Sequence, residues 1–288
     1  MAIAHRAHRL AYLVEQAILH HAPERQIRTL LACVARHQQE MSSSASFKAH
    51  NNHGVYMALG QLALARRLSP LPGMDALAKQ GRERLIAMLD SQFADDGGHL
   101  EHSPEYHHMV TDSLAVAVKH GLYTEPEFVE RVARAQEVLG WFVQPNGELP
   151  QVGDSQAKNM RKQVCELSPT ADFHLSRGVR GRPDTTNLRV LPTSGYAIVR
   201  YPQPQGTDDH EAAGYLLLAA GFHSRTHKHA DDLTVTWFDR GREILIDAGR
   251  FGYIDLLPKD SPLRLKGYFY GSPERQYVES TRAHNTVE

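Results

Sequence analysis

Residues 226–249 read THKHADDLTVTWFDRGREILIDAG, and this stretch decides how the second half of the chain folds. Apolar residues alternate with polar ones in LTVTWF, and a second apolar run, EILI, follows the turn residues DRGR. Successive side chains of a strand point to opposite faces of a sheet, so this alternation is typical of strands. The sequence therefore predicts an antiparallel hairpin that turns near Asp239–Gly241.

Two histidines stand one residue apart just before the first of these strands. In an extended backbone, residues i and i+2 face the same side, so His227 and His229 would present two imidazoles to one spot. Such a pair suits a metal site or a proton-transfer site. A solvated loop explains the same residues without any chemistry, and the local pattern leaves both interpretations open.

Strand patterns continue on both sides of this hairpin. They are GYAIVRY at 195–201, GYLLLAAGF at 214–222 and QYVES at 276–280. We therefore expect an antiparallel β part over residues 190–288. The polar, arginine-rich segment 151–189 that precedes it is expected to be a linker or long loop.

The first half of the chain has a different period. From about Ala7 to Trp141, apolar residues recur at helical spacing, in about six segments. Turn-forming residues separate them, as in SPLPG at 69–73, DDGG at 95–98 and QPNGELP at 144–150. We expect a helical part over residues 1–150, with three antiparallel helix pairs, so the fold is all-α and then antiparallel β.

Composition excludes several classes of protein. The chain has 288 residues, of which 41% are hydrophobic and 23% charged, and this balance is typical of a globular protein. Its formal net charge of -1 gives no basic field for nucleic acid. The N-terminal stretch MAIAHRAHRLAYLVEQAILHH is too polar to span a bilayer and shows no signal peptide. With 2 cysteines, no multi-cysteine zinc motif is available.

Two polar motifs in the helical part could carry chemistry. The first is NNHG at 51–54, where Asn51 or Asn52 can cap the third helix and His53 falls in its first turn. The second is GGHLEHSPEYHH at 97–108, where Ser103-Pro104 starts a helix that is expected to expose Tyr106 and His107. Helix capping explains part of both motifs. For the second motif, the density of His, Glu and Tyr makes a functional site as plausible as a purely structural role.

A possible metal site lies in the β part. Asp247 ends the second strand of the hairpin, so antiparallel pairing could bring its carboxylate beside His229, and AHNT at 283–286 offers His284. Two histidines, one aspartate and a water form an ordinary tetrahedral zinc site. Asp231 or Asp232 would then be partners that orient an imidazole. Such triples also arise by chance.

Taken in order, these motifs resemble the heparinase II/III-like polysaccharide lyases, a group that includes alginate and oligoalginate lyases. The ordered set is NNHG, GGHLEHSPEYHH, LPQVGDS, GYAIVR, HKHADDL with ILIDAGRFGY, and STRAHNT, from about residue 50 to the end. The resemblance implies an incomplete (α/α) toroid over 1–150 and an antiparallel β-sandwich over 190–288. Members are generally longer, so we expect a fragment that ends inside a strand.

The resemblance also implies roles for individual residues. Asn52 matches the asparagine that neutralises the uronate carboxylate, and His53 matches the histidine beside it. Tyr106 matches the catalytic tyrosine and His227 a further catalytic histidine. The ligands of a structural Zn²⁺ would be His229, Asp247 and His284.

The implied reaction is β-elimination at a uronic acid of an acidic polysaccharide or oligosaccharide. The C5 proton is weakly acidic, so the carboxylate must be neutralised before a base removes that proton and an acid protonates O4. Tyr106, with an ordinary pKa of about 10, suits the acid, and His53 or His227 is the alternative base. Which uronate polymer is cut, endo or exo action, and oligomeric state stay open, and the resemblance implies a periplasmic or secreted location.

Three other functions compete with this interpretation. A non-catalytic glycan-binding or exopolysaccharide-assembly protein on the same fold would tolerate loss of Tyr106. A zinc hydrolase would use His227 with the three metal ligands around an activated water. A structural helical scaffold would not need the polar cluster at 97–108.

Overall fold

The computed structural model describes residues 2–225 and 227–286, and these form two compact units. The first unit holds the residues up to Gln92 together with Ser113–Val129. The second holds Phe93–Asp112 and everything from Glu130 onward. We describe each unit separately.

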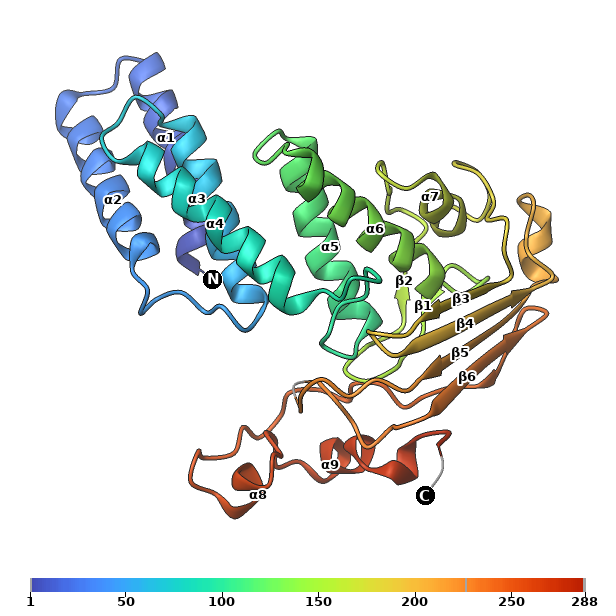
Figure 1. Ribbon diagram of the computed structural model, residues 1–288. Coiled ribbons are helices and arrows are strands. Elements are labelled where there is room, and N and C mark those ends of the chain that lie inside the picture. Colours follow the sequence, from blue (N-terminus) through green and yellow to red (C-terminus); the bar gives the residue numbers. More distant parts are fainter. Residues whose placement is uncertain (1, 226, 287–288) are drawn as a thin grey trace. The chain divides into compact units, whose positions relative to one another are not determined.

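Four amphipathic helices build the first unit (Figure 1). They are α1 (Ala2–Leu19), α2 (Glu24–Ser42), α3 (Asn52–Arg67) and α4 (Met74–Gln92). Helix α1 packs on α2 and α3, and α3 packs on α4. Their apolar faces meet in one core whose fully buried members include Ala7, Met41 and Leu64.

Two further helices, α5 (Pro104–Lys119) and α6 (Pro126–Phe142), have residues in both units. With them, the six helices predicted before residue 150 are all present. Within the described residues, no helix has the length and apolarity needed to cross a membrane.

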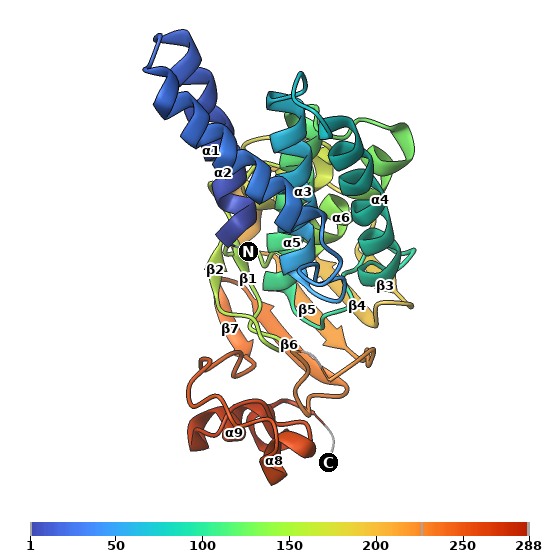
Figure 2. The same cartoon turned by 90° about the vertical axis from the view of Figure 1, so that its left-hand side faces the viewer.

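A five-stranded antiparallel sheet dominates the second unit, with its strands in chain order (Figure 2). The strands are β3 (Leu188–Leu191), β4 (Tyr196–Tyr201), β5 (Gly214–Ala219), β6 (Thr234–Asp239) and β7 (Arg242–Leu245), with a short 3₁₀ helix η1 (Asp208–Glu211) before β5. The predicted order of helices followed by an antiparallel sheet is therefore confirmed.

The predicted hairpin is formed by β6 and β7. Arg240 (φ 45°) and Gly241 (φ 79°) occupy the turn, and positive φ at both central residues is the mark of a type I′ turn. Within β6, the threonines Thr234 and Thr236 are buried, whereas Trp237 is exposed. The apolar alternation of this strand therefore points partly outward.

One face of the sheet packs on the C-terminal half of α6. Ile198 and Leu217 on that face share a core with Trp141 and Phe142 of α6. Arg200, which is 1% exposed, lies beside this core, and its Nη2 donates to the carbonyls of Gly140, Trp141 and Val143 at 2.6, 3.0 and 2.7 Å. A buried guanidinium thus satisfies carbonyls at the end of α6, which helix geometry leaves unpaired.

The opposite face of the sheet carries an apolar row that crosses all five strands. Cross-strand register aligns one residue from each strand, and all five are exposed: Leu188, Val199, Leu216, Trp237 and Leu245. Their exposed fractions run from 37% to 53%. We call these five residues the outer apolar row.

Residues 151–189 differ from the linker that the sequence predicts. The segment contains β2 (Lys158–Asn159), which pairs with β1 (Glu148–Leu149), and the helix α7 (Pro169–Leu175). Val152, Met160 and Cys165 are buried in the same core as the sheet. The sequence did not predict these elements, because the segment is rich in arginine and its apolar residues follow neither a helical nor a strand period.

The last part of the chain also departs from the prediction. QYVES, expected as a strand, lies mostly in the helix α9 (Pro273–Glu279), because Ser272 caps that helix and Pro273 opens it. A short helix α8 (Pro262–Leu265) precedes it and the 3₁₀ helix η2 (Thr281–Ala283) follows. Residues 284–286 belong to no strand, and residues 287 and 288, where the sequence was expected to stop inside a strand, lie outside the described residues.

Candidate functional site

The NNHG motif begins α3 in the first unit. Asn51 is the N-cap, and its Oδ1 accepts a hydrogen bond from the backbone N of His53 at 3.0 Å. Asn52 is the first helical residue, half-buried, and His53 follows it with an exposed side chain. The capping prediction is confirmed. The other predicted site residues all belong to the second unit.

Tyr106 is held in place by the start of α5. Pro104 opens the helix, and the side chain of Ser103 accepts from the backbone N of Tyr106 at 3.3 Å. Ser155 accepts from the backbone N of Glu105 at 3.2 Å and lies 2.8 Å from the hydroxyl of Ser103. Two serines from distant segments therefore fix the first turn of α5, and with it the half-buried tyrosine ring.

His107, which the sequence predicts to be exposed, is buried at 1% exposure. Its Nδ1 accepts from the backbone N of His99 at 3.2 Å, so its Nε2–H donates to the carbonyl of Ala135 at 2.8 Å. Burial lowers the pKa of His107 to about 3. His107 is therefore a neutral structural residue, because the face of α5 that carries it packs in the interior of the unit.

Tyr106 and His227 form a stacked pair. Their ring centroids are 3.9 Å apart, and the planes differ by 20°. His227 has a left-handed backbone (φ 55°), so its neighbourhood is not extended and the two imidazoles of HKH do not face one spot. His227 reaches Glu101, while His229 reaches Asp154.

A buried carboxylate orients the imidazole of His227. Glu101 is 7% exposed, and its Oε2 lies 3.2 Å from Nδ1 of His227. Burial by itself would raise the pKa of Glu101, but the hydrogen bond from His227 and the nearby histidines bring that pKa below its ordinary value. An ionised Glu101 only accepts, so Nδ1 of His227 carries a proton, and the neutral form of this ring has its lone pair on Nε2.

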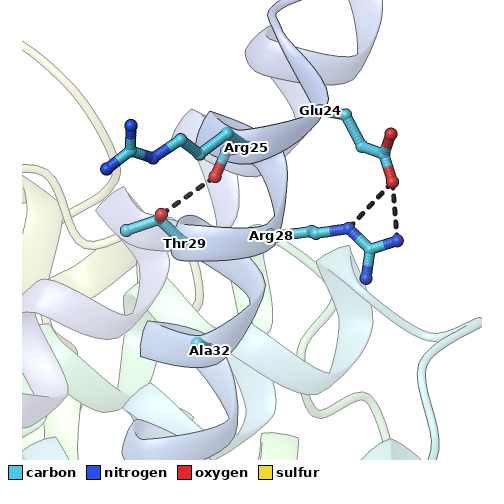
Figure 3. A pocket seen from close by; sticks show the side chains of 5 residues that line it. All are labelled: Glu24, Arg25, Arg28, Thr29 and Ala32. Atoms are coloured by element: carbon cyan, nitrogen blue, oxygen red, sulfur yellow. Dashed lines mark hydrogen bonds and ion pairs between the residues drawn. The ribbon is translucent and has the colours of Figure 1, made fainter.

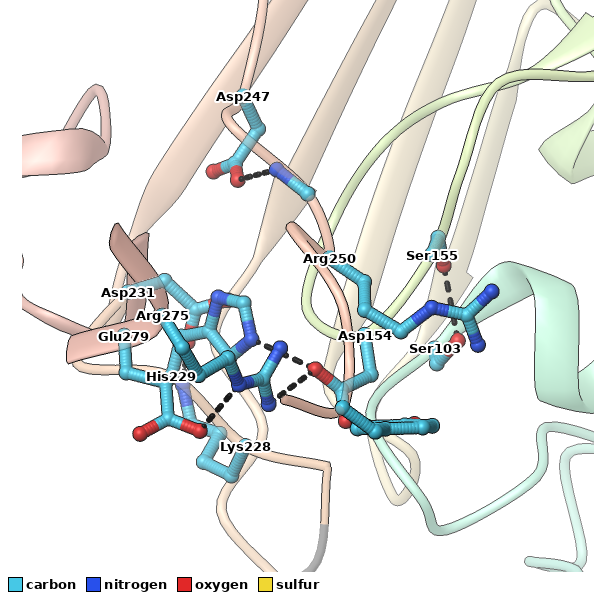
Figure 4. Close-up of polar contacts among 12 residues, drawn as sticks. Ser103, Asp154, Ser155, Lys228, His229, Asp231, Asp247, Arg250, Arg275 and Glu279 are labelled. Carbon is cyan, nitrogen blue, oxygen red and sulfur yellow. Dashed lines mark hydrogen bonds and ion pairs between the residues drawn. The ribbon is translucent and has the colours of Figure 1, made fainter. Parts of the chain in front are cut away.

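Asp154, from the motif LPQVGDS, accepts hydrogen bonds from three side chains, and Figure 4 shows two of them, His229 and Arg275. Its Oδ1 accepts from Nε2 of His229 at 2.9 Å and from Nη2 of Arg275 at 2.5 Å, and its Oδ2 accepts from the Tyr253 hydroxyl at 2.9 Å. Burial by itself would raise the pKa of Asp154, but the hydrogen bond from His229 and the charge of Arg275 hold it well below the usual range. The Tyr253 hydroxyl also lies 2.8 Å from the Tyr106 hydroxyl.

Gly153 allows this segment to come close to its neighbours. Its φ is 55°, and a Cβ there would lie 2.4 Å from the carbonyl oxygen of His102 and 3.1 Å from that of His227. Only glycine accepts both the backbone conformation and the contact. The glycine of the VGDS motif is therefore what lets Asp154 enter the site.

The partners of the HKHADDL segment differ from those predicted. Asp231 and Asp232 pair with Lys228, and neither contacts an imidazole in the described part of the chain. Asp154 contacts the imidazole of His229 instead. Arg275 links Asp154 to Glu279 of α9, with its Nε 2.7 Å from Oε1 of Glu279.

The three predicted metal ligands do come together. His229, Asp247 and His284 each offer one ligand atom, and these atoms lie within 4.8 Å of one another. Nδ1 of His284 lies 2.8 Å from Oδ2 of Asp247, which also accepts from the hydroxyl of Thr234 at 3.1 Å. The antiparallel hairpin thus brings Asp247 back to His229, as the spacing predicts.

The chemistry of these donors fits a metal ion. Nδ1 of His229 and Nε2 of His284 are buried and have no hydrogen-bond partner among the described residues. The opposite nitrogen of each ring is held by a carboxylate, so the neutral form of each ring has its lone pair on the open nitrogen. Two such nitrogens beside the carboxylate of Asp247 form a donor set that zinc accepts.

A surface hollow on α2 is unrelated to this site (Figure 3). Five exposed residues of that one helix line it: Glu24, Arg25, Arg28, Thr29 and Ala32. Glu24 and Arg28 form an ion pair at 2.6 Å, with both side chains about three-quarters exposed. A hollow with walls from a single helix encloses no ligand, and we assign it no function.

Comparison with known families defines the class of protein. Residues 12–174 match the model described as heparinase II/III N-terminus, and residues 183–288 match the heparinase II/III-like C-terminal model. The chain belongs to the heparinase II/III family. A search of curated proteins finds no match.

Solved structures share the fold. A crystal structure of heparinase III aligns with a TM-score of 0.76 and 17% identity, over 99% of this chain and 46% of that one. A heparan sulfate lyase from Pedobacter heparinus aligns with a TM-score of 0.70 and 18% identity, over 96% of this chain and 44% of that one. The chain thus spans less than half the length of these two proteins.

Three residues of the site escaped sequence analysis: Glu101, Asp154 and Tyr253. Each lies inside a motif that was singled out, in GGHLEHSPEYHH, LPQVGDS and ILIDAGRFGY. The motifs marked the segments, but they did not indicate which side chains within them would meet.

Proposed function

We propose that this protein is a lyase that cleaves uronate-containing polysaccharide by β-elimination. The observation that carries the proposal is the stacked pair of Tyr106 and His227, in which each ring is tethered to a buried carboxylate network. An acid and a base fixed side by side are what an elimination requires. Membership of the heparinase II/III family supports the same reaction.

His227 acts as the base in this proposal. Glu101 holds the proton on Nδ1, so Nε2 is free to take the C5 proton. The imidazolium that forms is stabilised by the ionised Glu101, as a carboxylate stabilises the histidine of a catalytic triad. No other proton needs to move at that moment.

Tyr106 acts as the acid. Burial raises its pKa above the ordinary tyrosine value, so the hydroxyl keeps its proton at neutral pH. As the bond to O4 breaks, the leaving oxygen gains negative charge and takes that proton. For the uronate carboxylate, we retain the role that the resemblance implies for Asn52, with His53 beside it.

We further propose that His229, Asp247 and His284 hold Zn²⁺. The ion would supply a cross-link between the HKH loop, the end of the hairpin and the segment after η2. His229 contacts Oδ1 of Asp154, whereas Tyr253 contacts Oδ2, so the cluster reaches the tyrosines only through this carboxylate, which favours a structural role over contact with substrate.

The test is ultraviolet detection of the 4,5-unsaturated uronate product. Heparan sulfate is the first substrate to try, because the solved relatives are named as heparinase III and a heparan sulfate lyase. Alginate, hyaluronan and a bacterial uronate exopolysaccharide follow. We expect absorbance to rise with one polymer. The rate of this rise should fall by at least about 100-fold in Tyr106→Phe and in His227→Ala.

Tyr201→Phe is the matched control, because Tyr201 is a tyrosine of β4 that is 72% exposed. Its rate should equal that of the wild type. A folded wild-type protein that binds one of these polymers but yields no unsaturated product would favour the non-catalytic glycan-binding function.

A further inference from the structure

A chain of hydrogen bonds runs from the candidate acid to a buried carboxylate. The Tyr106 and Tyr253 hydroxyls are 2.8 Å apart, and the Tyr253 hydroxyl is 2.9 Å from Oδ2 of Asp154. The Tyr253 hydroxyl is the donor to Asp154, so its single proton points to that carboxylate. The oxygen of Tyr253 must then accept from Tyr106, which fixes the direction of both hydrogen bonds.

From this arrangement we propose that Tyr253 is a positioning residue for Tyr106, and that it transfers its hydrogen bond from Asp154 to Tyr106 when Tyr106 gives up its proton. The inference rests on the proposed lyase activity for its catalytic consequence. The hydrogen-bond transfer itself is a property of this chain and can be measured without substrate.

The step balances without any further reactant. The O–H bond of Tyr106 breaks, its proton passes to O4 of the leaving sugar, and the electron pair stays on the Tyr106 oxygen. The Tyr253 hydroxyl then rotates about its C–O bond and donates to that oxygen, while Tyr253 keeps its own proton. Tyr106 later regains a proton through water, while His227 releases to water the C5 proton that it took.

Asp154 tolerates the loss of one donor because it has two others. His229 and Arg275 both remain on Oδ1, and Arg275 carries a full positive charge. The carboxylate is therefore still hydrogen-bonded and charge-balanced after Tyr253 turns away. A carboxylate held by Tyr253 alone would resist this rotation, because a buried unpaired charge is costly.

Other groups around Tyr106 act on the same charge. Tyr253 is its hydrogen-bond partner, Arg250 is the nearby cation, and Glu101 and Asp154 are the nearby anions. His227 stacks on its ring. Among the described residues, Tyr253 is the side chain whose hydroxyl is hydrogen-bonded to the Tyr106 oxygen, so it is the group whose rotation can follow the proton.

Steady-state kinetics gives the first test, with Tyr253→Phe. We expect kcat to fall about 100-fold, as when one donor to a developing oxyanion is removed, with KM unchanged. Tyr270→Phe is the matched control, because the Tyr270 ring stacks on Tyr253 at 5.0 Å but forms no bond to Tyr106 in the described structure. It should retain the wild-type kcat. Equal losses in both variants would show that ring packing alone matters and would overturn the proposal.

A titration of Tyr106 gives the second test and needs no activity. In protein labelled with ¹³Cζ-tyrosine, the Tyr106 signal is assigned by its loss in Tyr106→Phe. We expect its pKa to rise in Tyr253→Phe and to stay unchanged in Tyr270→Phe. An unchanged pKa in Tyr253→Phe would overturn the inference even if the protein is a lyase, whereas a shift in an inactive protein would leave the inference standing and the proposed function wrong.

If Tyr253→Phe fails to fold, 3-fluorotyrosine at position 253 serves instead. The fluorine makes the hydroxyl a stronger donor and leaves the ring almost the same size. The pKa of Tyr106 should then fall relative to the wild type. No change would overturn the proposal.

Discussion

The imidazole of His229 links the candidate metal cluster to the network around Tyr106. Its Nε2 donates to Asp154, and its Nδ1 is the open nitrogen of the cluster with Asp247 and His284. The ring is buried, at 3% exposure. One side chain therefore serves both a possible ion and the carboxylate that receives Tyr253.

His229→Ala should lose bound zinc and thermal stability together. Removing the ring deletes one proposed zinc ligand and leaves Asp154 with one donor fewer, and each change should destabilise the folded state. Elemental analysis of the purified protein and its melting temperature are the two measurements. His120→Ala, at an exposed histidine of the first unit, is the control. Full zinc content in the His229 variant would remove this residue from the ligand set.

At this scale, the sequence predicts the chemistry-bearing motifs better than their contacts. His229 and Tyr106 stand out because unusual residues crowd around them in the sequence. Their partners do not, because Tyr106 and Tyr253 are 147 residues apart, Glu101 and His227 are 126 apart, and Asp154 and His229 are 75 apart. Such pairs depend on how loops pack against the sheet, which no local period encodes.

Helix α6 and strand β4 are joined through a single cation. Arg200 places its guanidinium against three carbonyls at the end of the helix and 4.8 Å from the centroid of the Trp141 ring. Burial lowers the pKa of Arg200 to about 10, so the group is still charged at neutral pH. A positive charge at a helix C-terminus also interacts favourably with the helix dipole.

Arg200→Met should therefore lower the free energy of unfolding by about 3 kcal/mol, since the three carbonyls lose a charged donor inside the core. Urea denaturation measures the change. Arg189→Met is the matched control, because Arg189 on β3 pairs with Glu137 of α6 at 3.1 Å, with both side chains about a third exposed. That loss should stay within about 1 kcal/mol. Similar losses in both variants would contradict the capping role.

Helices and strands were predicted correctly where one sequence pattern dominates, and they were missed where a strand pattern and a helix-start pattern conflict. The six helices and the β6–β7 hairpin follow from long periodic runs and from Arg240-Gly241 in the turn. QYVES combines strand-forming Tyr277 and Val278 with a Ser-Pro start three residues upstream, and the start signal prevails. An i,i+4 ion pair between Arg275 and Glu279 supports the helix further.

The second unit as a whole buries an unusual number of histidines. Four of them have a pKa that burial lowers to between about 3 and about 4: His99, His107, His108 and His174. The folded protein holds these rings neutral. In the unfolded chain each ring takes a proton below about pH 6.5.

The contribution of these four histidines to the unfolding free energy should consequently be constant above about pH 7 and fall between about pH 6.5 and 4. In that window the unfolded chain binds more protons than the folded one, and each histidine adds a slope of up to about 1.4 kcal/mol per pH unit. Urea midpoints at a series of pH values measure it. His107→Gln, which stays neutral, should reduce the slope. Equal midpoints at pH 7.5 and pH 5 would rule the effect out.

The outer apolar row has a practical consequence for the whole molecule. Five exposed side chains at strand spacing form a stripe about 19 Å long. Moving such a stripe out of water and into contact with another nonpolar phase lowers the free energy. This chain will therefore be surface-active: it will collect at air–water interfaces and on plastic, so its apparent concentration will fall during stirring and storage unless a mild detergent covers the stripe.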